Sequence, residues 1–458
     1  MEKTLLTPSC LSLLLAIAMS LVFANTVSAR CLTSIATTDN VRTKMDEARD
    51  AACSIYFEPG LHSTTDKLSY TFTGTLADPV LIYGDSSSTT KLYRPNSNQN
   101  MMDMSGEYFV VKGLEFEGGA RGIRLENTVK NATFSDLKIH GTASSGFTAN
   151  TSGMSYTNIA VRHSQIYDTG GAGECFYMGC NNGFCTMGDS VIEFNTCGST
   201  NANQVSVQGE GIDLKGGAFN VVIRHNIFAN TGGPGILTYA NGGGPQNIIE
   251  GNLIWAPGEV GIQFTGDVII QNNVVIMDDK PNTVGINGSP NNQGTPNNTQ
   301  IRNNTVNMEF SETSNSCLEV RGWDEQAQNM VIANNAFYCK AGTAIYLGAG
   351  TSENVVIANN AVAGNVGTVP SGTFDGGEAV DQFIDINDAN FYPLGDSILL
   401  NAGANDQSPL NDFNCSRRAT NSTDVGAYYF EADVNPGWLS GDTFKTCVPF
   451  LFADGFEP

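Results

Sequence analysis

The sequence predicts an all-β fold, a right-handed parallel β-helix, from three observations. Similar segments recur about every 21 to 32 residues. Each segment carries a β-branched pair, an Asn, a second apolar pair, a Gly-containing turn and another short alternating run. No helical periodicity interrupts them, and the period is too short for a βαβ unit. Examples are NVVIRHNIFANTGGPGILTYANGG, NIIEGNLIWAPGEVGIQFTG and NMVIANNAFYCKAGTAIYLG.

One such coil cannot bury its apolar face alone, whereas stacked coils form a continuous core. The Asn residues fall at one equivalent place in successive coils, where stacked amides satisfy buried turns by hydrogen bonding along the axis. This predicted Asn ladder comprises Asn195, Asn226, Asn252, Asn273, Asn304, Asn335 and Asn360. Arg162-His163 and Arg224-His225 immediately precede ladder positions, which favours a role in turn packing or solvent exposure over anion binding.

The chain opens with Lys3, an apolar run from Leu11 to Phe23 and the small residues Val27-Ser28-Ala29. This pattern is typical of a secretory signal peptide, so we expect a secreted, periplasmic or extracellular protein. No later run reaches the roughly 20 apolar residues of a membrane span. The expected divisions are a signal peptide (1–29), an N-terminal cap with first coils (30–105), a β-helix core (106–375), closing coils (376–431) and a C-terminal tail (432–458).

The net charge of the chain limits the classes of macromolecule that it can bind. The formal net charge is −23, which argues against nucleic acid because its phosphates would be repelled. The same acidity weighs against anionic polysaccharides, unless calcium or a local basic strip reverses the field. We expect a monomer.

Ten cysteines follow the predicted signal peptide, and an even count in an exported chain favours disulfides. Cys175 and Cys197 are separated by 22 residues, as are Cys317 and Cys339, and adjacent coils bring such positions within disulfide reach. The expected pairs are Cys31–Cys53, Cys175–Cys197, Cys180–Cys185, Cys317–Cys339 and Cys415–Cys447. Zinc binding by Cys175, Cys180, Cys185 and Cys197 is the competing interpretation, but their spacing matches no common zinc pattern.

The chain resembles the secreted pectate-lyase-like β-helix superfamily. NVRTKMDEARDAAC is similar to its capping helix, and GTLADPVLIYGD to the first-coil motif that follows. NFYPLGDSILLNAGAN and RRATNSTDVGAYYFE resemble the closing coils of bacterial members. This resemblance implies a fold and a broad carbohydrate substrate class, while signatures of the main pectate lyase, pectin lyase and polygalacturonase families are absent.

Strand alternation predicts which side chains of the second strand in each coil point outward. The expected inward stack is Ile123, Phe147, Phe176, Ile212, Ile236, Ile262, Leu318 and Ile345. The first outward column is then Arg124, Thr148, Tyr177, Asp213, Leu237, Gln263, Glu319 and Tyr346. The second is Glu126, Asn150, Gly179, Lys215, Tyr239, Thr265 and Arg321.

This alignment places Glu174, Glu210, Asp213 and Lys215 on one exposed face of two neighbouring coils, beside Tyr177 and Tyr239. Aromatic rings next to charged groups suit a sugar-binding groove. The loop holding Cys180 and Cys185, and the insertion between Cys197 and Gly209, are candidate walls. The alternative is that these charged side chains have no function and are only solvated and paired with one another at the surface.

The first functional hypothesis is a polysaccharide lyase that cleaves a uronate polymer by β-elimination. Glu174, Glu210 and Asp213 would hold calcium as the cofactor. The expected catalytic residues are Lys215, which would act as the base, and Glu210 and Asp213 beside it. Tyr177, Tyr239 and the more distant Arg321 would bind substrate. Neighbouring carboxylates raise the pKa of a lysine, and this objection needs a bound cation to offset it.

Three alternatives remain open. Glu174 and Glu210 could be the carboxylate pair of a glycoside hydrolase, since adjacent coils lie about 4.8 Å apart. A uronate C5-epimerase would use the same proton abstraction as a lyase without cleaving the chain. A non-catalytic carbohydrate-binding or surface protein would use the charged face only for adhesion.

Overall fold

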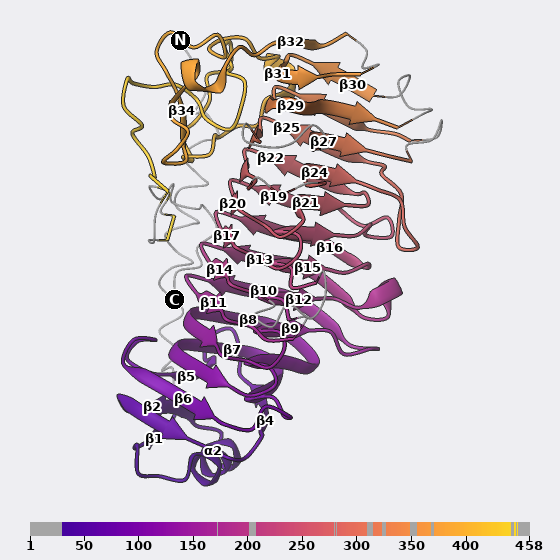
Figure 1. The fold of residues 1–458 in the computed structure, drawn as a ribbon. Helices are drawn as coiled ribbons and strands as arrows, with labels where there is room; N and C mark the ends of the chain where they lie inside the picture. The colour runs from indigo at the N-terminus through magenta and orange to yellow at the C-terminus, as the bar shows by residue number, and fades with distance from the viewer. Residues whose placement is uncertain are drawn as a thin grey trace, which may run out of the picture.

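The computed structural model describes residues 30–171, 173–200, 208–278, 280, 282–308, 315–322, 327–348, 355–367, 371–440, 444–445 and 447. The predicted signal peptide and the end of the predicted tail, 448–458, lie outside these described residues. The described chain winds into an elongated right-handed parallel β-helix (Figure 1), as the repeats predict.

Parallel pairing between successive coils sorts the strands into three ladders. The first ladder contains β1 (Leu32–Ile35), β2 (Ser54–Phe57), β5 (Val80–Tyr83), β10 (Ser155–Arg162), β13 (Thr186–Glu193), β16 (Ala218–Arg224), β19 (Asn247–Glu250), β22 (Val268–Gln271), β25 (Thr299–Arg302), β28 (Met330–Ala333) and β30 (Val355–Ala358). The second ladder contains β3 (Gly60–Ser63), β6 (Thr90–Arg94), β11 (Gln165–Tyr167), β14 (Thr196–Gly198), β17 (Ile227–Ala229), β20 (Leu253–Trp255), β23 (Val274–Ile276), β26 (Thr305–Asn307), β31 (Asn360–Asn365) and β32 (Thr373–Asp375).

The third ladder carries the candidate site described below. It contains β4 (Leu68–Thr73), β9 (Phe147–Ala149), β12 (Phe176–Met178), β15 (Ile212–Leu214), β18 (Ile236–Thr238), β21 (Val260–Phe264), β24 (Val284–Gly288) and β27 (Ser316–Val320). Three long strands bend and contribute to more than one ladder: β7 (Met102–Gly118), β8 (Ile123–His140) and β29 (Ala336–Leu347).

The capping helix forms at the predicted place, as α2 (Val41–Asp50). Asn40 caps it, because its side-chain oxygen accepts a hydrogen bond from the Thr43 backbone N–H at 2.9 Å. Val41, Met45 and Ala48 are buried, so the apolar face of the helix covers the open end of the first coils. Among the described residues, no helix is long and apolar enough to cross a membrane.

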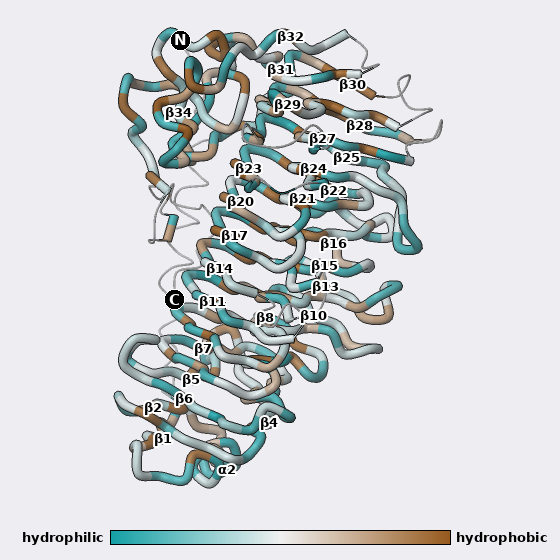
Figure 2. The backbone as a smooth tube through the Cα atoms, in the orientation of Figure 1, coloured by the Kyte–Doolittle hydropathy of each residue, from teal (hydrophilic) through white to brown (hydrophobic). Residues whose placement is uncertain are grey.

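The interior of the solenoid is the predicted stack of apolar side chains. All eight residues expected to point inward on the third ladder have no solvent exposure. The stack also contains Ile286 on β24, which the sequence alignment left out although it pairs with Ile262 and Leu318. Figure 2 shows hydrophobic segments recurring from coil to coil along the whole column. Continuous burial of this kind is what makes a stack of individually unstable coils stable.

The predicted Asn ladder runs through seven consecutive coils, and all seven side chains are buried. Asn226 is representative: its Nδ2 donates to Asn252 Oδ1 at 3.0 Å and to the Ile192 carbonyl at 2.8 Å. The residue before each ladder Asn has a left-handed φ, between 51° and 62°. Each turn is thus a sharp corner whose backbone groups are satisfied by the amide of the next coil.

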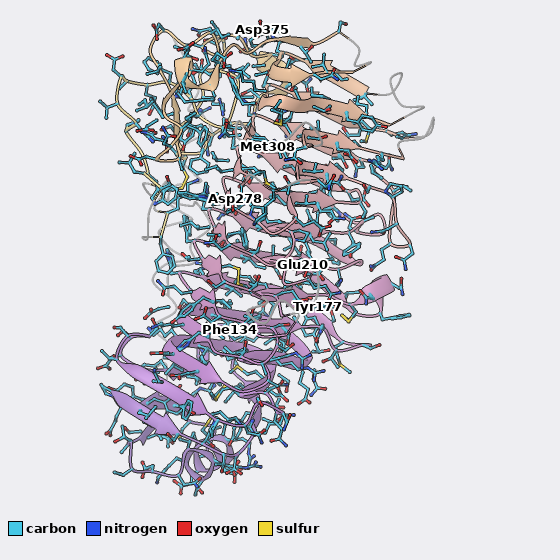
Figure 3. The ribbon with its side chains drawn as sticks, in the orientation of Figure 1. Phe134, Tyr177, Glu210, Asp278, Met308 and Asp375 are labelled. Carbon is cyan, nitrogen blue, oxygen red and sulfur yellow. A yellow bond between two sulfur atoms is a disulfide. The ribbon has the colours of Figure 1, made fainter. Side chains whose placement is uncertain are left out.

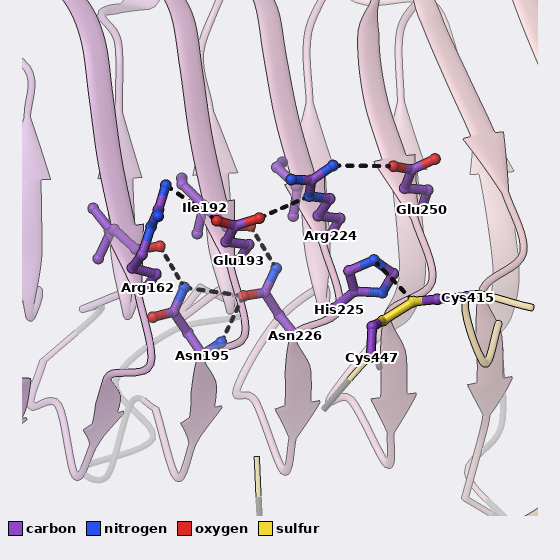
Figure 4. Close-up of polar contacts among 12 residues, drawn as sticks. Arg162, Ile192, Glu193, Asn195, Arg224, His225, Asn226, Glu250, Cys415 and Cys447 are labelled. Atoms are coloured by element: carbon purple, nitrogen blue, oxygen red, sulfur yellow. Dashed lines mark hydrogen bonds and ion pairs between the residues drawn. A yellow bond between two sulfur atoms is a disulfide. The ribbon is translucent and has the colours of Figure 1, made fainter. Parts of the chain in front are cut away.

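The corner residues also explain the two Arg-His pairs. His163 stacks on Phe194 with ring centroids 5.1 Å apart, and Phe194 stacks on His225 at the same distance. Arg162 and Arg224 both form ion pairs with Glu193, at 3.2 and 2.8 Å (Figure 4). The preferred interpretation, turn packing, is therefore confirmed.

All five expected disulfides are present in the structure. Cys175–Cys197 and Cys317–Cys339 have Cα atoms 6.0 and 5.9 Å apart, as their equal sequence spacing suggested. The competing zinc interpretation of Cys175, Cys180, Cys185 and Cys197 is wrong, because each of these sulfurs is bonded to another cysteine.

The C-terminal segment leaves the solenoid and folds back along its second ladder (Figure 1). It contains η4 (Ala379–Asp381), the antiparallel pair β33 (Phe383–Asp385) and β34 (Asn390–Pro393), and η5 (Asn405–Gln407). Its apolar residues form a separate core with Ile227, Leu253 and Val274 of β17, β20 and β23. Among the described residues, this packing covers the second ladder.

The Asn ladder makes a testable prediction about stability. Asn273→Ala removes an amide that accepts from Asn252 and donates to the Ile249 carbonyl at 2.9 Å. Because buried backbone and amide groups then lose their partners, we expect the free energy of unfolding to fall by about 2 to 4 kcal/mol. Chemical denaturation followed by circular dichroism measures the change. Asn127→Ala, at an exposed position on β8, is the control, and an equal loss in both variants would contradict the ladder's role.

Candidate active site

The third ladder holds the predicted outward column in its predicted order. Tyr177 on β12 pairs with Asp213 on β15, and Asp213 pairs with Leu237 on β18. Towards the N-terminus, Thr148 pairs with Tyr177 and Arg124 with Thr148. Asn287 lies between Gln263 and Glu319, in the coil that the alignment left out. Glu210 and Tyr177 lie close together on the side away from the C-terminal segment (Figure 3).

Three carboxylates converge at this point of the ladder. One oxygen each from Glu174, Glu210 and Asp213 lies within 4.8 Å of the other two. Glu174 and Glu210 precede β12 and β15 by two residues, and Asp213 lies within β15. Ser145 Oγ donates to Glu174 Oε2 at 2.6 Å, and the Gly209 N–H donates to Glu210 Oε2 at 3.0 Å. We call these three residues the acidic cluster.

The expectation that this patch is exposed is wrong. Glu174, Glu210, Asp213 and Lys215 keep only 6, 7, 2 and 9 % of their surface accessible. Close coil spacing is the physical reason, because each side chain is enclosed by those of the coils above and below. Tyr177 and Tyr239 remain partly exposed and form the accessible rim of the cluster.

Lys215 lies at the centre of this arrangement. Its Nζ is 2.6 Å from Asp213 Oδ2. The same ammonium lies 5.1 Å from the ring centroid of Tyr177 and 4.9 Å from that of Tyr239. Cation–π contacts on both sides hold the amine in place. The expected grouping of Lys215 with the acids and both tyrosines is therefore present in the structure.

Burial has the largest effect on the pKa values of the three carboxyl groups in the acidic cluster. It raises the pKa of Asp213 to about 7, against the opposing effect of Lys215. Burial likewise raises the pKa of Glu174 and of Glu210. Burial by itself lowers the pKa of Lys215, but Asp213 beside it raises that pKa overall. The lysine is thus an ammonium ion at neutral pH, which agrees with the objection raised from the sequence.

The acidic cluster fits a hard cation such as calcium. Two oxygens bound to one calcium ion lie at most about 5 Å apart, because each Ca–O distance is roughly 2.3–2.6 Å. The separations within the cluster satisfy this limit. In addition, Asp213 Oδ1 is buried with no hydrogen-bond partner. Three buried carboxylates beside one ammonium leave negative charge that a divalent cation would neutralise.

A loop closes one side of the cluster. Cys180 and Cys185 bracket η2 (Asn181–Gly183), and Gly183 lies against Gly217, just after Lys215. The Asn182 N–H donates to Gln293 Oε1 at 2.9 Å, which ties this loop to the one that follows β24. The second expected wall, the insertion before Gly209, falls mainly on residues 201–207 and so lies outside the described residues.

Arg321 is not brought to the cluster. It follows β27, four strand pairings along the ladder from β15. There it contacts Glu319, and its guanidinium carbon lies 5.8 Å from the Tyr346 ring centroid. Trp323, Asp324 and Glu325, which follow Arg321 in the sequence, lie outside the described residues.

Two neighbours of the cluster were missed from the sequence. Ser145 occupies the position two residues before Phe147, equivalent to Glu174 in the next coil, so the same alignment could have found it. Glu259 precedes β21 and is exposed, yet partial desolvation followed by the charge of Glu210 raises its pKa. No sequence signal marked Glu259, because its turn differs from those before β12 and β15.

Comparison with known proteins agrees with this architecture. Residues 102–275 match the family model described as a right handed beta helix region. Among solved structures, the chain is similar to pectate lyase Pel9A, at 15% identity and a TM-score of 0.50, over 88% of this chain and 97% of that one. It is also similar to a PL6 family alginate lyase, AlyGC, at 16% identity and a TM-score of 0.51, over 89% of this chain and 60% of that one.

No curated protein sequence matches the chain. At these identities the similarity establishes the fold alone. The chain is therefore a right-handed parallel β-helix protein. The same fold is found in pectate lyase Pel9A and alginate lyase AlyGC.

The protonation of Asp213 makes a prediction about metal binding. A carboxylate binds calcium only when deprotonated, so protons compete with the metal below a pKa of about 7. We expect calcium affinity to fall about tenfold from pH 8 to pH 6, since one proton must be displaced. Isothermal titration calorimetry at both pH values measures the affinity. Asp213→Asn should weaken binding and flatten the pH dependence, whereas a wild-type affinity independent of pH would contradict the assignment.

Proposed function

We propose that this protein is a carbohydrate-active enzyme, a calcium-dependent polysaccharide lyase that cleaves uronate-containing polysaccharide by β-elimination. One observation carries the proposal: a buried cluster of three carboxylates has a lysine amine 2.6 Å from one of them, under a rim of two tyrosines. Pectate and alginate lyases among the structures of similar fold support the same substrate class. Five disulfides support action in an oxidising compartment outside the cytoplasm.

Each group has a defined role in this proposal. Glu174, Glu210 and Asp213 would hold the calcium ion, which when bound neutralises a substrate carboxylate and so acidifies the adjacent C5 proton. Tyr177 and Tyr239 would stack against the sugar rings through their exposed edges. Burial raises the pKa of both phenols, so they stay neutral at physiological pH.

Lys215 would be the base. In the metal-free protein Asp213 raises the pKa of Lys215 and keeps the amine protonated. Once the charge of Asp213 is shared with a cation, that effect weakens and the burial of the amine favours its neutral form. The neutral Nζ would take the C5 proton, the C–H electrons would form the C4–C5 double bond, and the C4–O bond would break. The leaving oxygen would then take up a proton.

A glycoside hydrolase is the second candidate. Oxygens of Glu174 and Glu210 lie within 4.8 Å of each other, near the roughly 5 to 5.5 Å separation of carboxyl groups in retaining enzymes. Burial raises the pKa of both, as a general acid requires. This reaction needs no calcium and forms no unsaturated product.

Lys215→Met tests the proposed base. Methionine keeps the apolar stem between Tyr177 and Tyr239 but removes the amine, so we expect formation of unsaturated uronate ends to fall at least about 100-fold. Ultraviolet absorbance of the unsaturated product measures the rate on polygalacturonate and alginate, and thermal unfolding verifies the fold. Lys130→Ala, an exposed lysine at another position, is the matched control. Undiminished elimination by Lys215→Met would remove this lysine from the mechanism.

Chelation tests the metal requirement separately. We expect a calcium chelator to abolish elimination, and added calcium to restore it, because the acidic cluster alone leaves Lys215 protonated. Reducing ends that form at the same rate in chelator, without ultraviolet absorbance, would favour the hydrolase instead.

A further inference from the structure

Two arginines lie on the third ladder, on the N-terminal side of the acidic cluster. Arg124 on β8 pairs with Thr148 on β9, which pairs with Tyr177 on β12. Two strand spacings, about 10 Å, therefore separate Arg124 from Tyr177. Arg121 precedes β8 by two residues, the position that Glu174 occupies before β12. Both arginine side chains are partly exposed.

Neither guanidinium has a carboxylate within ion-pair distance in the described part of the chain. Asp103 and Glu126 on the ladder both lie beside Lys67, whose Nζ contacts Asp103 and is 3.5 Å from Glu126 Oε1. Glu174 and Asp103 act on Arg121 by charge, from beyond ion-pair distance. Arg124 Nη2 donates to Thr151 Oγ1 at 3.0 Å, and Arg121 Nη1 lies 3.5 Å from Asn100 Oδ1. Among the described residues, the two cations thus form hydrogen bonds with neutral side chains and no direct ion pair.

The same strip holds more hydrogen-bond donors than acceptors. The Nε atoms of Arg121 and Arg124 are buried with no hydrogen-bond partner. The hydroxyl of Thr148, between Arg124 and Tyr177 and fully buried, has none either. A ligand that supplies hydrogen-bond acceptors would satisfy these donors. Burial, and then the charge of Arg124, lowers the pKa of Arg121, and the charges of Glu174 and Asp103 only partly oppose this effect.

We propose that Arg121 and Arg124 form an anion subsite that binds the carboxylate of a uronate unit adjacent to the one held at the acidic cluster. The proposal rests on the proposed function for the identity of the substrate. A guanidinium suits this ligand because its planar N–H groups bind a carboxylate with two parallel hydrogen bonds. The subsite is a local basic strip on a chain of net charge −23, and it makes binding of a polyanion compatible with that charge.

Direct binding measurements test the subsite apart from catalysis. In the Lys215→Met background, which the proposed function makes inert, polygalacturonate and alginate oligomers would be titrated by calorimetry in chelator. We expect Arg121→Ala and Arg124→Ala each to raise Kd about tenfold for these oligomers, the loss of one charge-assisted pair. Arg124→Lys should recover only part of the affinity, since an ammonium cannot form the paired hydrogen bonds. Lys130→Ala is the charge-matched control.

Methyl-esterified galacturonate oligomers provide the matched ligand. The ester groups mask the carboxylates, so we expect the arginine variants to bind esterified oligomers as tightly as the parent protein does. We also expect the affinity for esterified oligomers to stay constant between about 50 and 300 mM salt. Equal losses for free and esterified oligomers, or a loss below twofold for the free acid, would overturn the subsite.

The two proposals fail separately. If the arginine variants lose carboxylate binding but the wild-type protein forms no unsaturated ends, the subsite stands and the lyase proposal falls. If elimination occurs and arginine removal leaves carboxylate binding intact, the lyase proposal stands and the subsite falls.

Discussion

The structure depends on one constraint, the fixed spacing at which each coil must rest on the next. A corner residue with left-handed φ turns the chain, and a buried Asn immediately after it bonds to the same residue of the following coil. Each amide satisfies both a side chain and a backbone group, so no coil can rotate or slip without breaking several buried hydrogen bonds. The inward stack, the strand register and the alignment of outward side chains all follow from this spacing.

The same constraint creates the candidate site. Glu174 and Glu210 are 36 positions apart in sequence, yet stacking brings their carboxylates together with that of Asp213. It also explains the unusual electrostatics, because side chains enclosed between neighbouring coils lose solvent whether or not they are charged. Within the described part of the chain, the three carboxylates of the acidic cluster have only the Lys215 ammonium among them, and they lie under the partly exposed rings of Tyr177 and Tyr239. A buried group of three carboxylates with one ammonium is more typical of a functional site than of a structural ion pair.

Much of this was predictable from the sequence, because period-two alternation and the repeating Asn define which residues meet. The ladder and the companions of Lys215 follow from that pattern, the disulfides from the spacing of the cysteines, and the capping helix from the family resemblance. The burial of the acids does not, since it depends on how closely neighbouring side chains enclose them. Ile286 was missed because its coil diverges from the repeat. Arg121 lies two residues before its strand, as Glu174 and Glu210 do, so the same alignment could have found it.

The turns differ greatly in length although the ladder does not. Successive ladder bonds join residues 21 positions apart in one case, between Asn252 and Asn273, and 31 in others, such as Asn273 and Asn304. Extra residues therefore bulge outward and leave the frame unaltered. Loops on such a scaffold can be exchanged or grafted without disturbing the outward side chains of the ladders. Changes in loop sequence therefore have little effect on the stability of the solenoid, and the loops can vary more than the strands do.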